Sequence, residues 1–246
     1  METTNYEYKL IPTFGNSFRT GWRVMRDNFL RLLLVVIVLG VLTAPMKYNF
    51  NFDAKSLHGF PWNWNMDFNH LLGFMSLGAL ALFFGMLSLL YSFLAAPVVE
   101  FGGKMIFLQA VRKIKPDFEL LISGFWTNYL TIILANLLVF ALVVIGLFFF
   151  IVPGIIIACR LAFTAYIVMD KKLDPIEAVE MSWKLTRGHG WKIFFMGFVS
   201  IFIIIFGLIL IIVGILPAIM WVSGSFASLY QSVLNEKEKT AEAVAA

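Results

Sequence analysis

The sequence predicts an all-α, polytopic membrane protein with six transmembrane helices in three hairpins, joined by short amphipathic cytoplasmic helices. Three observations predict this class. Of the 246 residues, 60% are hydrophobic and only 14% are charged, whereas soluble proteins have about 25% charged residues. Several apolar runs exceed the roughly 18 residues that suggest a membrane span. Lysine and arginine are concentrated in alternate connections between these runs.

The predicted spans are apolar runs bounded by polar residues, prolines or glycines. They cover residues 29–44, 71–99, 128–150, 153–169, 191–213 and 215–234. Residues 1–234 therefore form one membrane domain. The polar segment 235–246 is expected to be a disordered cytoplasmic tail.

The distribution of positive charge predicts the orientation. Five lysines and arginines precede or begin the first span, four lie between the second and third spans, five between the fourth and fifth, and two in the tail. The opposite side holds only Lys47 and Lys55. Both termini are therefore expected in the cytoplasm, which requires an even number of spans. The same distribution accounts for the net charge of +4 without a nucleic-acid partner.

The connection 46–70 contains many Tyr, Phe and Trp residues, which is typical of an interfacial belt. It also contains two histidines and two aspartates whose spacing fits no metal signature: His58, His70, Asp53 and Asp67. The single cysteine, Cys159, lies inside a span. We therefore expect no metal site, no intrachain disulfide and no cofactor.

A weak internal repeat indicates the three hairpins. Short amphipathic helices at 18–28, 118–128 and 176–190 each lead into a long span, which is followed by a turn near a proline. The prolines are Pro45, Pro153 and Pro217. A glycine precedes the second and the third of them, at Gly146 and Gly207.

Pro153 and Gly154 divide one long apolar run, and we interpret them as a helix break at a tight turn between the third and fourth spans. Arg160 follows about 10 Å along the new helix. Arginine costs about 2.5–3.5 kcal/mol at mid-membrane. The functional interpretation is a cation that holds an anion or gates a cavity. The structural interpretation, which we favour, pairs Arg160 with Glu100 or with carbonyl groups freed by the break, or lets it reach the interface.

Asp170 is expected to end the fourth span in water. Asp174 and Pro175 then begin an amphipathic helix, with Asp174 as its cap. The apolar face of this helix is expected to lie on the membrane surface and contains Ile176, Val179 and Trp183.

A second candidate site lies at the start of the fifth span. Arg187, His189 and Lys192 stand beside the N-terminus of that helix, where amide groups favour a lipid phosphate. Anchoring at the membrane interface explains the same residues, and we favour that interpretation.

These segments also carry a resemblance. The residues are Ile151-Val-Pro-Gly-Ile-Ile, Arg160, Asp174-Pro-Ile-Glu-Ala and Ser182-Trp-Lys-Leu-Thr-Arg-Gly-His-Gly-Trp. Over about residues 118–195 the chain resembles the YciC-like bacterial six-span membrane proteins and the membrane domain attached to some glycerophosphoryl diester phosphodiesterases. The resemblance implies a bacterial cytoplasmic (inner) membrane. It implies no activity, because the phosphodiesterase chemistry belongs to a separate soluble domain.

No pattern in the sequence indicates catalysis. It contains no Walker loop, HExxH, GxSxG or dinucleotide fingerprint, and no pair of carboxylates placed for acid–base work. We therefore expect no catalytic residues and a non-enzymatic structural or accessory membrane component. The alternative is a small transporter or lipid-handling protein with a cavity near Arg160. The expected partners are membrane lipids, with a membrane protein partner or a second copy of the chain left open.

Overall fold

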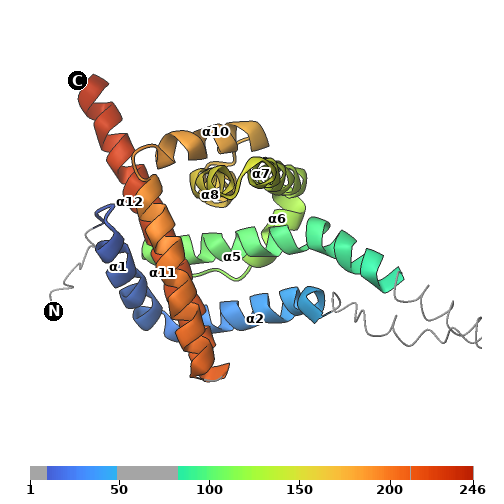
Figure 1. Cartoon of the computed structure of the whole chain (residues 1–246). Coiled ribbons are helices and arrows are strands. Elements are labelled where there is room, and N and C mark those ends of the chain that lie inside the picture. Colours follow the sequence, from blue (N-terminus) through green and yellow to red (C-terminus); the bar gives the residue numbers. More distant parts are fainter. Residues whose placement is uncertain (1–9, 49–82, 211, 246) are drawn as a thin grey trace, which may run out of the picture.

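The computed structural model describes residues 10–48, 83–210 and 212–245, and all its regular elements in these ranges are helices (Figure 1). The helices are α1 (Phe14–Asp27), α2 (Phe29–Tyr48), α5 (Ala96–Val111), α6 (Leu120–Thr127), α7 (Tyr129–Phe149), α8 (Ile151–Arg160), α9 (Thr164–Lys171), α10 (Pro175–Thr186), α11 (Gly190–Ile209) and α12 (Ile212–Ala245). Most of the aromatic connection 46–70, with its histidines, and residues 71–82 of the second predicted span lie outside the described residues.

Within the described residues, four helices are long and apolar enough to cross a membrane, which indicates a multi-pass α-helical membrane protein. They are Phe83–Val111, Tyr129–Phe149, Ile151–Lys171 and Gly190–Ile209, and a shorter apolar helix covers Phe29–Thr43. The first of the four contains the end of the second predicted span and continues beyond residue 99 to Val111. Gly102 in this continuation lies directly against Leu120 and Leu121 at the start of α6.

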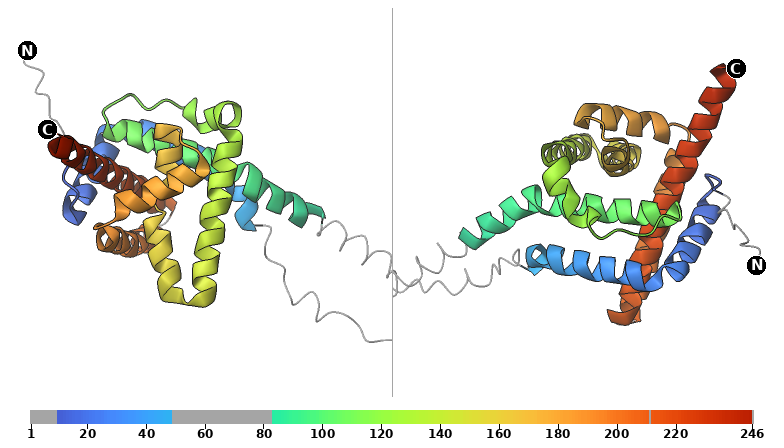
Figure 2. Two further views of the ribbon diagram at one scale, coloured as in Figure 1. Left: turned by 90° about the horizontal axis from the view of Figure 1, so that it is seen from above. Right: turned by 180° about the vertical axis from the view of Figure 1, so that it is seen from behind.

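Three antiparallel helix pairs project from a common centre in different directions (Figures 1 and 2). In Figure 1, α7 and α8 are seen end-on, α2 and the helix leading into α5 run across the view, and α11 and α12 run down it. Tyr91 donates a hydrogen bond of 2.8 Å to the Leu42 carbonyl and joins the second of these pairs. The far ends of the pairs expose large apolar side chains, and the buried core lies where the pairs meet.

The turns of two hairpins depend on close approaches between glycines. Phe150 is the one extended residue between α7 and α8, so the predicted turn is present, but Pro153 lies inside the first turn of α8. A Cβ atom on Gly146 would lie 3.0 Å from the Gly154 Cα. At the α11–α12 turn, a Cβ atom on Gly207 would lie 2.8 Å from the Gly214 carbonyl oxygen. The two glycines of the predicted repeat therefore occupy equivalent helix contacts.

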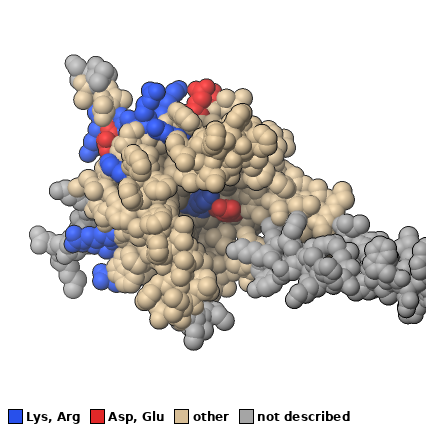
Figure 3. All heavy atoms as spheres, in the orientation of Figure 1, with Lys and Arg blue, Asp and Glu red and all other residues tan. Residues whose placement is uncertain are grey.

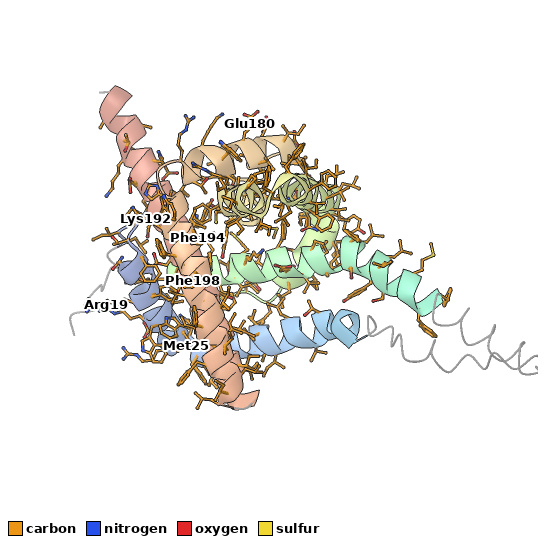
Figure 4. The ribbon with its side chains drawn as sticks, viewed as in Figure 1. Arg19, Met25, Glu180, Lys192, Phe194 and Phe198 are labelled. Carbon is orange, nitrogen blue, oxygen red and sulfur yellow. The ribbon has the colours of Figure 1, made fainter. Side chains whose placement is uncertain are left out.

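The N-terminal helix α1 packs along α12. Phe18 and Met25 are buried in this contact, and the Trp221 indole donates a 2.9 Å hydrogen bond to the Phe18 carbonyl. The closest approach is at Gly21, where a Cβ atom would lie 2.6 Å from the Ser225 backbone nitrogen. Arg19 lies on the exposed face of the helix and Met25 is buried on the other (Figure 4). The amphipathic pattern of α1 thus buries its apolar face in the protein core.

A partly buried ion pair joins α5, α9 and α12. The Arg112 guanidinium, at the end of α5, donates to both carboxylate oxygens of Asp170 on α9, at 2.5 and 2.7 Å. On α12, the Tyr230 hydroxyl donates to Asp170 at 3.1 Å, and the Gln231 side-chain oxygen accepts from Arg112 at 2.7 Å. Burial alone would lower the pKa of Arg112, but the hydrogen bond and the charge of Asp170 outweigh burial and raise that pKa above its ordinary value.

This contact corrects the expectation that Asp170 ends its helix in water, because the Asp170 side chain is only 7% exposed. The expected disordered tail 235–246 is wrong too, since α12 continues to Ala245. Its last residues are mainly Ala, Glu and Lys, which favour helix. Glu236 and Glu238 also approach His189 and Lys171 on neighbouring segments, at 3.4 and 3.3 Å.

Replacing Asp170 by asparagine should lower the free energy of unfolding by about 1–3 kcal/mol, because it leaves the partly buried Arg112 charge without its partner. The measurement is equilibrium unfolding of the purified chain in detergent. Glu180→Gln is the matched control, since Glu180 pairs with Lys184 on the exposed face of α10, and such pairs contribute about 0.3–0.5 kcal/mol. Equal effects of the two substitutions would contradict the structural role assigned to Asp170.

Gly21→Ala should destabilise the protein by about 1–3 kcal/mol, because the added methyl group meets the α12 backbone. Gly15→Ala, on the same helix, places its methyl group in open space. That control should be neutral or slightly stabilising, since alanine favours helix over glycine. Thermal unfolding of both variants tests the packing of α1 on α12, and a Gly21→Ala variant as stable as wild type would refute it.

Candidate functional site

The helix that contains Arg160 is interrupted directly after this residue. The Thr164 amide donates to the Leu161 carbonyl at 3.1 Å and so leaves the Arg160 carbonyl without its helical partner. The hydroxyl groups of Ser182 and Thr186 donate to that carbonyl at 2.9 and 3.1 Å. The predicted span 153–169 therefore consists of two helices, α8 and α9. Helix α10 is hydrogen-bonded to the interruption between them.

The Arg160 guanidinium lies over the indole ring of Trp183, with its Cζ atom 5.7 Å from the ring centroid. Its Nη1 atom is buried and has no hydrogen-bond partner. The expected pair with Glu100 is not formed within the described part of the chain, since Glu100 lies 3.0 Å from Lys104, one turn further along α5. The carbonyl freed by a helix break is that of Arg160 itself, and the hydroxyl groups of α10 satisfy it.

A cavity of about 500 Å³ lies beside Arg160, between α8 and the start of α11. Its lining contains Val152, Ile155, Ile156, Cys159 and Arg160 from α8, and Gly188, Gly190, Trp191 and Phe194 at the start of α11. Arg160 is the only charged residue of this lining, and most of the other side chains are apolar. The cavity therefore combines a cation at one end with an apolar wall.

Of the predicted site residues, only Arg160 lines the cavity; Arg187, His189 and Lys192 of the second candidate site do not. The N-terminus of α11 borders it through Gly190 and Trp191. His189 instead is buried and its Nε2 atom lies 3.4 Å from Glu236. Arg187 and Lys192 are absent from the lining. Figure 4 shows Lys192, Phe194 and Phe198 following one another along α11 from its start.

The charged side chains gather away from the projecting hairpins. Figure 3 shows lysines and arginines at the upper left, over α10 and the C-terminal end of α12, and at the left over α1. Acidic side chains lie beside them at the top and upper left, and a further acidic and basic pair lies near the centre of this face.

The cavity offers one guanidinium and a largely apolar wall. A guanidinium forms charge-assisted hydrogen bonds with anionic groups, and an apolar wall is suited to hydrocarbon. Among the described residues there is no group of three or more His, Cys, Asp or Glu side chains that would hold a metal ion.

Sequence reasoning missed Ser182 and Thr186 as residues of this site. They are four positions apart on α10 and both are buried, whereas Ile176 on the same helix is exposed. A serine and a threonine at this spacing on one helix face were the available signal, because such hydroxyl groups satisfy carbonyls in apolar surroundings. The expected apolar face of α10 is the face turned away from the protein core.

Comparison with known proteins assigns no family. No family model, curated protein or solved structure matches the chain. The cavity and its residues are therefore the basis of the functional proposal.

Substituting Ser182→Ala and Thr186→Val together should cost about 1–3 kcal/mol, because the buried Arg160 carbonyl loses both donors. The matched control is Ser123→Ala with Thr127→Val, a pair at the same spacing on α6 that bonds only to its own helix. Melting temperatures in detergent measure both. Comparable losses in the two double variants would show that α10 is not held by the Arg160 carbonyl.

Proposed function

We propose that this chain is a non-enzymatic, multi-pass protein of the bacterial cytoplasmic membrane that handles lipids by binding an anionic amphiphile beside Arg160. The single observation that supports this function most is the presence of Arg160 in the lining of an otherwise apolar cavity. A guanidinium forms strong, charge-assisted hydrogen bonds with an anionic group, which an apolar wall cannot provide.

The lining favours an amphiphile over a water-soluble solute. Sites for polar solutes contain several convergent polar groups, whereas Arg160 is accompanied mainly by aliphatic and aromatic residues. Of the two forms of the alternative, a small transporter or a lipid-handling protein, the apolar lining therefore favours lipid handling.

The membrane arrangement we propose has six spans in three hairpins, with both termini in the cytoplasm. Its support is the four long apolar helices together with α2 and the apolar first part of α12, which complete three antiparallel pairs. The excess of lysine and arginine in alternate connections supports the orientation. The bacterial location follows from the resemblance to YciC-like proteins.

A structural or accessory role is the second candidate. The observation in its favour is that Arg160 already has a structural task, since its carbonyl holds α10 and its side chain lies on Trp183. In that case the cavity is an incidental gap, and the partner is another membrane protein or a second copy of the chain. The two candidates differ in what the purified protein retains.

Native mass spectrometry of the chain released from its own membrane in mild detergent should show a retained anionic amphiphile. Arg160→Gln should lose most of it, because the substitution removes the cation of the cavity. Arg187→Gln is the control, since Arg187 is exposed and lies outside the cavity lining.

Equal loss in the two variants would point to a diffuse charge effect and would contradict the site. Retention of a protein partner with no amphiphile would support the accessory role instead. The melting temperature of each variant is recorded, so that loss of the fold is not mistaken for loss of binding.

A further inference from the structure

The head group of the ligand can be named from the geometry of the cavity, and this inference rests on the proposed function. We propose that the cavity binds the phosphate group of a phospholipid between Arg160 and the N-terminus of α11, with an acyl chain lying along α8. Three features of the site support this proposal: the guanidinium of Arg160, the N-terminus of α11 and the apolar wall along α8.

The guanidinium of Arg160 is held on two sides. Its Cζ atom lies 5.7 Å from the centroid of the Trp183 ring, and the backbone of Arg160 is fixed to α10 through its carbonyl. Arg160 is part of the cavity lining, and arginine binds carboxylate or phosphate oxygens through the N–H groups at the edge of the guanidinium plane.

The start of α11 adds a second set of donors. The first amides of a helix have no intrahelical partner, and the helix dipole places partial positive charge there. Gly188 and Gly190 border the cavity, and a Cβ atom built on either glycine meets nothing within 4 Å. The cavity therefore reaches the start of α11, and no side chain of these two residues stands between them.

These two sets of donors distinguish phosphate from carboxylate. A carboxylate has two oxygens, and a guanidinium engages both in its preferred geometry. A phosphate diester adds further oxygen atoms that remain available to the amides of α11. A phosphate group therefore uses the arginine and the helix terminus together, whereas a fatty acid uses only the first.

The wall of the cavity favours a lipid as the source of the phosphate. From Arg160 back to Val152 the lining follows α8 for eight residues, about 12 Å at 1.5 Å per residue. Ile155 and Ile156 lie on this path, and Phe194 borders it from α11. No acidic residue is part of the lining to repel the head group. A free phosphate ion would leave this apolar path unused.

The test uses the full-length chain, purified and stripped of lipid in detergent, and titrated in native mass spectrometry. The probes are dioleoylphosphatidylglycerol, oleate and inorganic phosphate. The variants are Arg160→Gln and Gly190→Val, with Gly197→Val as the matched control on the same helix, since a Cβ atom there also meets open space. Circular dichroism confirms that each variant keeps its helices.

We expect the phospholipid to bind at least about tenfold more tightly than oleate or inorganic phosphate, because charge-assisted hydrogen bonds contribute about this much. Arg160→Gln and Gly190→Val should each weaken phospholipid binding by about tenfold or more, whereas Gly197→Val should leave it unchanged.

Oleate binding as tight as phospholipid binding, or an unaffected Gly190→Val variant, would overturn the phosphate inference and leave the proposed function standing. If inorganic phosphate binds as tightly as the phospholipid, the inference that the phosphate group belongs to a lipid is wrong. If none of the three probes binds to the wild-type chain in a way that depends on Arg160, both the inference and the proposed function fail.

Discussion

The pair formed by Arg112 and Asp170 determines how the three helix pairs meet. Arg112 is at the end of α5, which packs with α2, and Asp170 lies on α9, which follows α8. Tyr230 and Gln231 extend the contact to α12. Ions taken out of water are costly unless each finds its partner. Displacing any one of the three helix pairs would leave Arg112, Asp170 or Tyr230 without a hydrogen-bond partner. The pair therefore favours one arrangement of the three helix pairs.

The same segment links this pair to the cavity. Asp170 and Arg160 stand at opposite ends of the stretch that contains the helix interruption and α9. The interruption frees the Arg160 carbonyl, and α10 satisfies it with two buried hydroxyl groups. Because α9 is fixed by the ion pair and α8 by α10, the guanidinium of Arg160 is placed between two anchored helices. The architecture of the core thus positions the binding group.

Periodicity and composition were sufficient for the elements that depend on local sequence. The apolar runs, the turn between α7 and α8 and the amphipathic helix α1 all follow from which residues stand next to one another. Asp170 was misjudged because a charge at a helix end usually faces water, and its burial depends on Arg112 and Tyr230 from distant segments. The pairing of Arg160 with Glu100 failed for a similar reason, since Lys104 on the same helix is a nearer partner. The helical tail shows the converse, because its helix-forming composition outweighed its polarity.

The rim of the cavity has a consequence for how a ligand reaches it. Val152, Ile156 and Trp191 line the cavity and are also exposed on the outer surface of the helix pairs. In a bilayer, an opening bordered by such residues faces the hydrocarbon chains of neighbouring lipids and not the aqueous phase. Occupancy would then follow the mole fraction of the lipid within its leaflet, through lateral diffusion. Its concentration in water would be irrelevant, so the site would report on membrane composition.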